Sequence, residues 1–141
     1  MLYQLIYSSR AAQPMTPAAL EEILVDARAG NATHDITGAL VYVDGVFIQI
    51  LEGDRDDVNR LLASIADDPR HRSLKVFYEA EIERRAFASW RMAYVAATRE
   101  QMLAWAGLPA ATTIDELLAD ISRDASRGAE ILRNILQTVA G

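Results

Sequence analysis

The segment ITGALVYVDGVFIQILEG, residues 36–53, contains two apolar runs separated by Asp44 and Gly45. A two-residue Asp-Gly step between apolar runs is the strongest short-range signal for a β-hairpin, because both residues tolerate the positive φ angles of a type I′ turn. The sequence therefore predicts antiparallel strands over residues 36–43 and 46–52. Both runs are apolar at odd and even positions, which indicates that both faces of their sheet are covered.

The segments on either side of the hairpin predict three more strands and two helices. Strands are expected over residues 2–7, 73–82 and 90–96, and helices from Pro17 to Gly30 and from Asp54 or Asp56 to Pro69. Both helical segments carry apolar residues at the spacing of one helical face, and Thr16 before Pro17 is typical of a capped start. The order β-α-β-β-α-β-β predicts an α+β, ferredoxin-like sheet with two helices on one face.

The last part of the chain can cover the other face of that sheet. Residues 98–106 predict a short helix, and residues 113–139 predict a longer apolar helix that Ser126 and Gly128 can interrupt. We expect residues 1–96 to form the main domain and residues 97–141 to form a C-terminal helical extension packed on the sheet.

Composition excludes several classes of function. The chain has 141 residues, 51% of them hydrophobic, which fits one compact domain. A formal charge of −6 disfavours binding to nucleic acid or to anionic membrane surfaces. There is no cysteine and no apolar stretch of the ~18 residues that a membrane span needs, so we expect a soluble, cytoplasmic protein.

Gln49 interrupts the otherwise apolar run 46–51. A buried carboxamide is costly unless hydrogen bonds satisfy it, so Gln49 either meets backbone or water, or serves a site. Strand alternation lets Tyr7, Trp90 and Met92 converge with Gln49 on one sheet face. Ordinary packing is the alternative explanation for each of these residues taken alone.

The two helices can form a flat slot above that face. Ile23 and Ile65 occupy corresponding positions on the two helices, and Asn31, which follows the helix-ending Gly30, would direct its amide at the mouth. A planar ring with polar edges suits such a slot.

Four segments together resemble the BLUF family of blue-light sensors that use flavin. They are LIYSSR (5–10), GNATHDITGALVYVDGVFIQILEG (30–53), IADDPRH (65–71) and RRAFASWRMAY (84–94). The resemblance covers residues 1 to about 96, in order and at the family's spacing. The remaining residues resemble the two-helix tail of short members of the family, which carry no output enzyme.

The resemblance implies a flavin held between the two helices, and FAD is the expected form, with FMN or riboflavin as alternatives. The implied cofactor-binding residues are Ile23 and Ile65 against the ring, Asn31 and Gln49 at its polar edge, and Arg70 and His71 beside it. The implied photoactive residues are Tyr7, Gln49, Trp90 and Met92. Many members place a second polar residue beside the asparagine, whereas Gly30 and Ala32 flank Asn31 here, which implies a weaker hold on flavin.

The resemblance also implies a mechanism. Excited flavin takes an electron and a proton from Tyr7, the charges recombine, and Gln49 is left rotated or tautomerised. The last strand and the C-terminal helices then signal to an unknown protein partner or within a homo-oligomer. Under this reading the chain is a photoreceptor and is not itself an enzyme, and no metal is required.

Other functions have weaker support in the sequence. Ser8 or Ser9 with His71 lacks the strand-turn-helix pattern around a hydrolase nucleophile, and a phosphatase using Arg10 would show activity in the dark without flavin. Neither His34 nor His71 has a convincing set of metal ligands around it. The main alternative is a flavin-free ferredoxin-like interaction or small-ligand module, which would be colourless.

Overall fold

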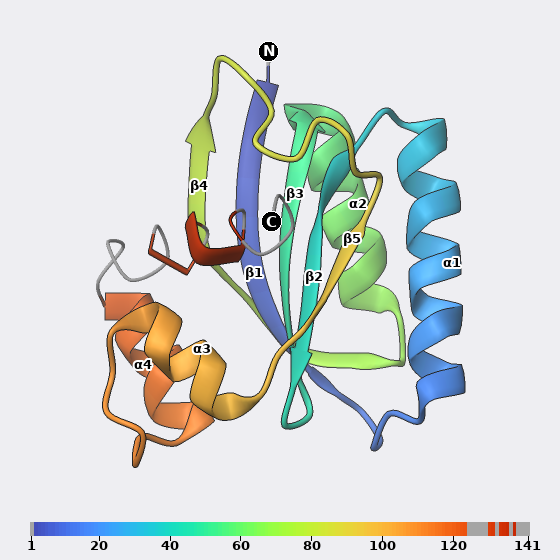
Figure 1. Ribbon diagram of the computed structural model, residues 1–141. Helices are drawn as coiled ribbons and strands as arrows, with labels where there is room; N and C mark the ends of the chain where they lie inside the picture. Colours follow the sequence, from blue (N-terminus) through green and yellow to red (C-terminus); the bar gives the residue numbers. More distant parts are fainter. Residues whose placement is uncertain (1, 124–129, 132, 136, 138–141) are drawn as a thin grey trace.

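The computed structural model describes residues 2–123, 130–131, 133–135 and 137, which form a sheet with helices on both faces (Figure 1). The strands are β1 (Leu2–Ala11), β2 (Thr37–Val43), β3 (Val46–Asp54), β4 (His71–Glu81) and β5 (Ala93–Ala96). The helices are α1 (Pro17–Thr33), α2 (Arg55–Asp67), α3 (Arg99–Ala106) and α4 (Ile114–Arg123). This element order confirms the predicted α+β, ferredoxin-like fold.

The strand order in the sheet is β4-β1-β3-β2-β5, with β1 antiparallel to both of its neighbours. The β2–β3 hairpin is confirmed, since Val43 pairs with Val46 and the turn residues Asp44 and Gly45 have φ angles of 49° and 77°. The added strand β5 pairs with β2 in parallel.

Strand alternation separates two hydrophobic cores. One core lies under α1 and α2, and it includes Leu5, Tyr7, Phe47, Leu51, Ile23 and Val58. The other core lies under α3 and α4, and it includes Ile48, Ile50, Val95, Phe87, Met102 and Leu117. Both sheet faces are therefore covered, which explains why β2 and β3 are apolar at both parities.

Three predicted boundaries are wrong. β1 continues past residue 7 to Ala11, because its polar last residues still pair with both β3 and β4. Helix α1 does not end at Gly30 but runs to Thr33, and the turn to the left-handed conformation comes at Asp35, with a φ of 53°. β5 begins at Ala93, three residues after the predicted start.

The helix caps follow local side-chain chemistry. The Asp54 carboxylate accepts from the backbone N–H of Asp56, so of the two predicted caps of α2 it is Asp54 that begins the helix. Thr98 and Gln101 form a capping box at the start of α3. The predicted break at residues 126–128 lies outside the described residues, while Ile131 and Ile135 are helical and buried in the core under α3 and α4.

Candidate functional site

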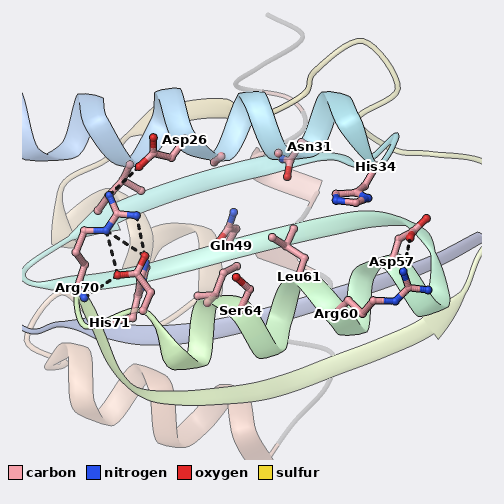
Figure 2. Close-up of a pocket in the computed structure, with 15 residues that line it drawn as sticks. Asp26, Asn31, His34, Gln49, Asp57, Arg60, Leu61, Ser64, Arg70 and His71 are labelled. Atoms are coloured by element: carbon pink, nitrogen blue, oxygen red, sulfur yellow. Dashed lines mark hydrogen bonds and ion pairs between the residues drawn. The ribbon is translucent and has the colours of Figure 1, made fainter.

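A cavity of about 360 Å³ lies between α1 and α2, above the sheet (Figure 2). This volume is in the range of small-molecule sites in proteins. The lining includes six residues predicted from sequence, namely Ile23, Asn31, Gln49, Ile65, Arg70 and His71. The cavity therefore lies where the two helices were expected to form a slot.

Hydrophobic side chains line the two helical walls of the cavity. Ile23 comes from α1, Leu61 and Ile65 come from α2, and Gln49 comes from β3 at the floor. Apolar side chains on both walls, together with a polar group at the floor, fit a flat ring that carries hydrogen-bonding groups on one edge.

Gln49 is buried, and both ends of its carboxamide have partners. The Tyr7 hydroxyl donates to its Oε1, and its Nε2 lies 3.5 Å from Sδ of Met92. Burial raises the pKa of the Tyr7 phenol well above its usual value, and the Asp68 carboxylate raises it further. The raised pKa therefore keeps the phenol protonated at neutral pH.

Among the described residues, the two side-chain partners of Gln49 are Tyr7 and Met92, and Trp90 is not one of them. Its side chain is 44% exposed, and it precedes β5 rather than belonging to that strand. Met92 is 2% exposed and is the residue that contacts Gln49. Sequence alternation placed both on one face of a strand predicted over residues 90–96, but β5 begins only at Ala93, so alternation does not apply to them.

Asn31 lies in the last turn of α1 and not beyond the helix as expected. Its Nδ2 donates to the Arg91 carbonyl at 2.5 Å. Within the part of the chain that the structure describes, its Oδ1 is buried and accepts no hydrogen bond. Because a buried acceptor without a donor is costly, a ligand in this cavity that offers an N–H group fits Asn31.

Arg70 closes one end of the cavity with two ion pairs (Figure 2). Its Nη2 lies 2.7 Å from the Asp68 carboxylate after α2, and its Nη1 lies 3.2 Å from the Asp26 carboxylate on α1. The bond from Arg70 lowers the pKa of Asp68. The guanidinium thus links α1 to the connection between α2 and β4.

His71 lies beside Arg70 and is half-buried. Its Nδ1 is 2.8 Å from Oγ of Ser9, and its ring centroid is 4.8 Å from that of Phe47. Burial lowers the pKa of His71, and the Arg70 charge acts in the same direction, against the Asp68 carboxylate.

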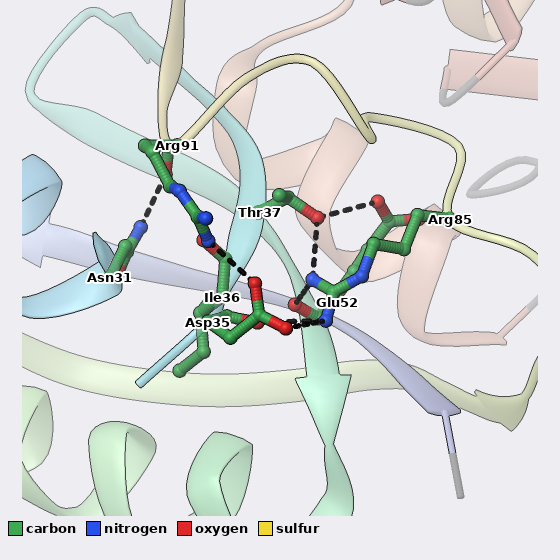
Figure 3. Close-up of polar contacts among 7 residues, drawn as sticks. All are labelled: Asn31, Asp35, Ile36, Thr37, Glu52, Arg85 and Arg91. Atoms are coloured by element: carbon green, nitrogen blue, oxygen red, sulfur yellow. Dashed lines mark hydrogen bonds and ion pairs between the residues drawn. The ribbon is translucent and has the colours of Figure 1, made fainter. Parts of the chain in front are cut away.

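A second polar cluster was not predicted from the sequence (Figure 3). Glu52 is fully buried, and its carboxylate accepts bonds from the backbone N–H groups of Ala86 and Phe87, each at 2.7 Å. Gln4 and Thr37 also donate to it. A signal was present in the sequence, because Glu52 closes the apolar run of β3 just as Gln49 interrupts it.

Asp35 anchors the connection between β4 and β5 near this cluster (Figure 3). Its carboxylate lies 2.9 Å from Nη1 of Arg91 and 3.3 Å from Nη2 of Arg85. These two guanidinium groups lower the pKa of Asp35, with the Arg91 hydrogen bond as the larger cause. Both arginines belong to the segment that leads into Met92.

The fold and the cavity define a small α+β domain with a cavity of ligand size between two helices, and its family follows from comparison with known proteins. Residues 2–93 match the BLUF family, described as "Sensors of blue-light using FAD". The chain belongs to this family of blue-light photoreceptors, whose members bind flavin.

Solved structures agree with this assignment. The dark-state structure of BlrB, a BLUF protein, has 29% identity and a TM-score of 0.75, and the match covers 97% of this chain and 96% of that one. The photo-activated state of BlsA has 28% identity and a TM-score of 0.74, with coverage of 96% and 95%.

Curated relatives include much longer proteins. A photoactivated adenylate cyclase subunit beta from Euglena longa is 39% identical over 104 residues, which is 73% of this chain. This chain spans 12% of that protein's length.

None of the helices in the described ranges combines the length and the apolar character needed to cross a bilayer.

Proposed function

We propose that this chain senses blue light through a flavin held in the cavity between α1 and α2. Tyr7 and Gln49 would be the residues whose hydrogen bonds respond to the excited flavin. The observation that carries the proposal is the Gln49 carboxamide, buried at the cavity floor between the Tyr7 hydroxyl and the Met92 thioether. A bound isoalloxazine ring would supply blue-light absorption and an excited state that accepts an electron and a proton.

The chain's own residues would hold the Tyr7 proton in the dark and would take it back after excitation. The Tyr7 phenol stays protonated in the dark because burial raises its pKa, so it can give up an electron and a proton together. The Gln49 carboxamide has two donors and one acceptor group on one short arm, so it can exchange its partners by rotating or by changing tautomer. Met92 Sδ is a weak acceptor and releases the amide at small cost.

Different cavity residues would contact different parts of the ring. We assign Ile23 and Ile65 to its two faces and the buried Oδ1 of Asn31 to an N–H group at its polar edge. Arg70 and His71 would lie at the end where the flavin tail leaves the cavity.

FAD is the proposed flavin, on the strength of the family description. Arg70 is already paired with Asp26 and Asp68, so a flavin phosphate at this end would compete with two carboxylates for it.

The signal would leave through the segment that carries Met92 and through β5 to the helices on the other sheet face. We propose residues 1–96 as the sensor and residues 97–141 as the extension that passes the signal to a homo-oligomer or a protein partner in the cytoplasm. The chain itself would act as a sensor and not as an enzyme, and Trp90 would act at most indirectly because it is exposed. The relatives named as cyclases are proteins of which this chain spans a small part.

An absorption spectrum tests the proposal. The purified protein, supplied separately with FAD, FMN and riboflavin, is measured in the dark, directly after blue light and during recovery. A structured flavin band that shifts reversibly to the red is expected. A protein that takes up none of the three flavins would overturn the proposal and favour the flavin-free interaction module.

A further inference from the structure

Three successive carbonyl groups ahead of β5 each accept a hydrogen bond from a residue far away in the sequence. The three bonds run from Gly38 N–H to the Trp90 carbonyl at 3.0 Å, from Asn31 Nδ2 to the Arg91 carbonyl at 2.5 Å, and from Arg28 Nε to the Met92 carbonyl at 3.2 Å. The segment lies outside any strand, so these bonds replace the ladder that would otherwise fix its position.

Two of the three donors lie on α1. Arg28 and Asn31 are three residues apart in the helix, so their side chains lie on the same side of it and reach neighbouring carbonyls. The Asp35 carboxylate, just beyond the helix, binds the Arg91 guanidinium at 2.9 Å (Figure 3). The end of α1 therefore holds the backbone that places Met92.

The contact between Met92 and Gln49 depends on this placement. A thioether sulfur is a weak acceptor, so its 3.5 Å contact with Gln49 Nε2 cannot by itself hold the backbone of Met92 in position. Arg28 holds the Met92 backbone from outside the cavity, because it is not one of the residues that line the cavity. Its own effect on Gln49 must pass through Met92.

We infer that Arg28 is a positioning residue of the photoactive network. By holding the Met92 carbonyl, it keeps the thioether against the Gln49 amide and so biases which partner each end of the carboxamide takes. The inference rests on the proposed function in that Gln49 is taken as the group that rearranges.

The first test needs neither flavin nor light. The protein is labelled with ¹³C at its methionine methyl groups, and the Met92 resonance is assigned by its loss in Met92→Leu. Arg28→Ala should move the Met92 resonance, because the thioether leaves the Gln49 amide, and Arg28→Lys should restore much of its position, because lysine can still donate to the carbonyl. Arg84→Ala, an exposed arginine in the same β4–β5 connection, is the matched control and should leave the resonance unchanged.

The second test uses the flavin-loaded protein. Arg28→Ala should change the rate of dark recovery by about threefold or more, the scale of one net hydrogen bond, and in the same direction as Met92→Leu. Because Arg28 acts through Met92, the double variant Arg28→Ala/Met92→Leu should recover at the rate of Met92→Leu alone.

The outcomes distinguish the positioning role of Arg28 from the proposed light-sensing function. An unmoved Met92 resonance in Arg28→Ala, or two rate effects that simply multiply in the double variant, would overturn the role of Arg28. A wild-type protein without any light-induced shift would overturn the proposed function, while a moved resonance would still show that Arg28 positions Met92.

Discussion

Tyr7 and Gln49 lie directly opposite each other in the register of β1 and β3, and the Tyr7 hydroxyl donates to Oε1 of Gln49 inside the core. Cross-strand partners of this kind share one sheet face and have their Cβ atoms about 5 Å apart, so backbone pairing fixes the side-chain pair.

The first prediction concerns the Tyr7 hydroxyl. Tyr7→Phe should keep flavin bound but lose the reversible red shift, because the carboxamide loses its proton-donating partner while the ring still fills the core.

The matched control is Tyr42→Phe, which removes a hydroxyl from a tyrosine whose ring contacts Phe47 in the same core. Difference spectra recorded before and after blue light should show the full shift in Tyr42→Phe. A full shift in Tyr7→Phe would remove Tyr7 from the mechanism.

The second prediction concerns the buried carboxylate of Glu52. Glu52→Gln should lower the free energy of unfolding by about 2 kcal/mol, because an amide group then faces donors that had met a carboxylate oxygen. The backbone N–H groups of Ala86 and Phe87 are the donors most directly affected. Urea unfolding followed by far-UV circular dichroism measures the change.

Glu21→Gln is the control, since Glu21 is exposed on α1 and the substitution removes the same charge. Equal denaturation midpoints for the two variants would show that the bonds from Ala86 and Phe87 to the Glu52 carboxylate do not stabilise the fold.

Much of the fold was predictable because its signals are local. The Asp44-Gly45 turn, the caps at Thr16 and Asp54, and the apolar parity of β2 and β3 are each encoded within a few residues. Helical and strand periodicity likewise assigned Ile23, Ile65 and Gln49 to the faces that line the cavity, whereas Arg70 and His71 were expected there only from the family resemblance.

The errors lie where distant contacts override local preference. Glycine is a common residue at helix ends, yet α1 passes through Gly30. The helical turn that follows Gly30 carries Asn31, which donates to the Arg91 carbonyl. The position of Trp90 depends on where pairing with β2 begins, which no property of residues 90–92 determines. The bonds of Glu52 join β1, β2 and the β4–β5 connection, so only the folded chain shows them.

The third prediction concerns pH. Burial lowers the pKa of His71 in the folded protein, so the unfolded chain binds more protons between that lowered pKa and the ordinary value of about 6.5. The free energy of unfolding therefore has its full value above about pH 7 and falls as the pH drops below about 6.5. Urea midpoints measured across this range should show the decline, and His71→Gln should flatten it.

His34→Gln is the matched variant, because His34 is exposed and lines the same cavity. A wild-type decline that persists unchanged in His71→Gln would assign the pH dependence to other groups.

The last prediction concerns two glycines with opposite surroundings. A Cβ added to Gly38 would lie 1.9 Å from the carbonyl oxygen of Ile50, a backbone atom of the neighbouring strand that cannot move aside, whereas a Cβ added to Gly30 meets nothing within 4 Å. Gly38→Ala should therefore lower the free energy of unfolding by about 3 kcal/mol or prevent folding. Gly30→Ala should raise it by about 0.5–1 kcal/mol, because Gly30 is helical and alanine loses less conformational freedom on folding.

Thermal and urea unfolding of both variants measure these changes. Gly53→Ala supplies an intermediate case, because its nearest contact is a side-chain carbon of Ile36 at 3.2 Å, a looser contact than the one at Gly38. The expected order of stability is Gly30→Ala above wild type, then Gly53→Ala, then Gly38→Ala. A destabilised Gly30→Ala would contradict the helical conformation of α1 at this position, and with it the placement of Asn31 within the helix.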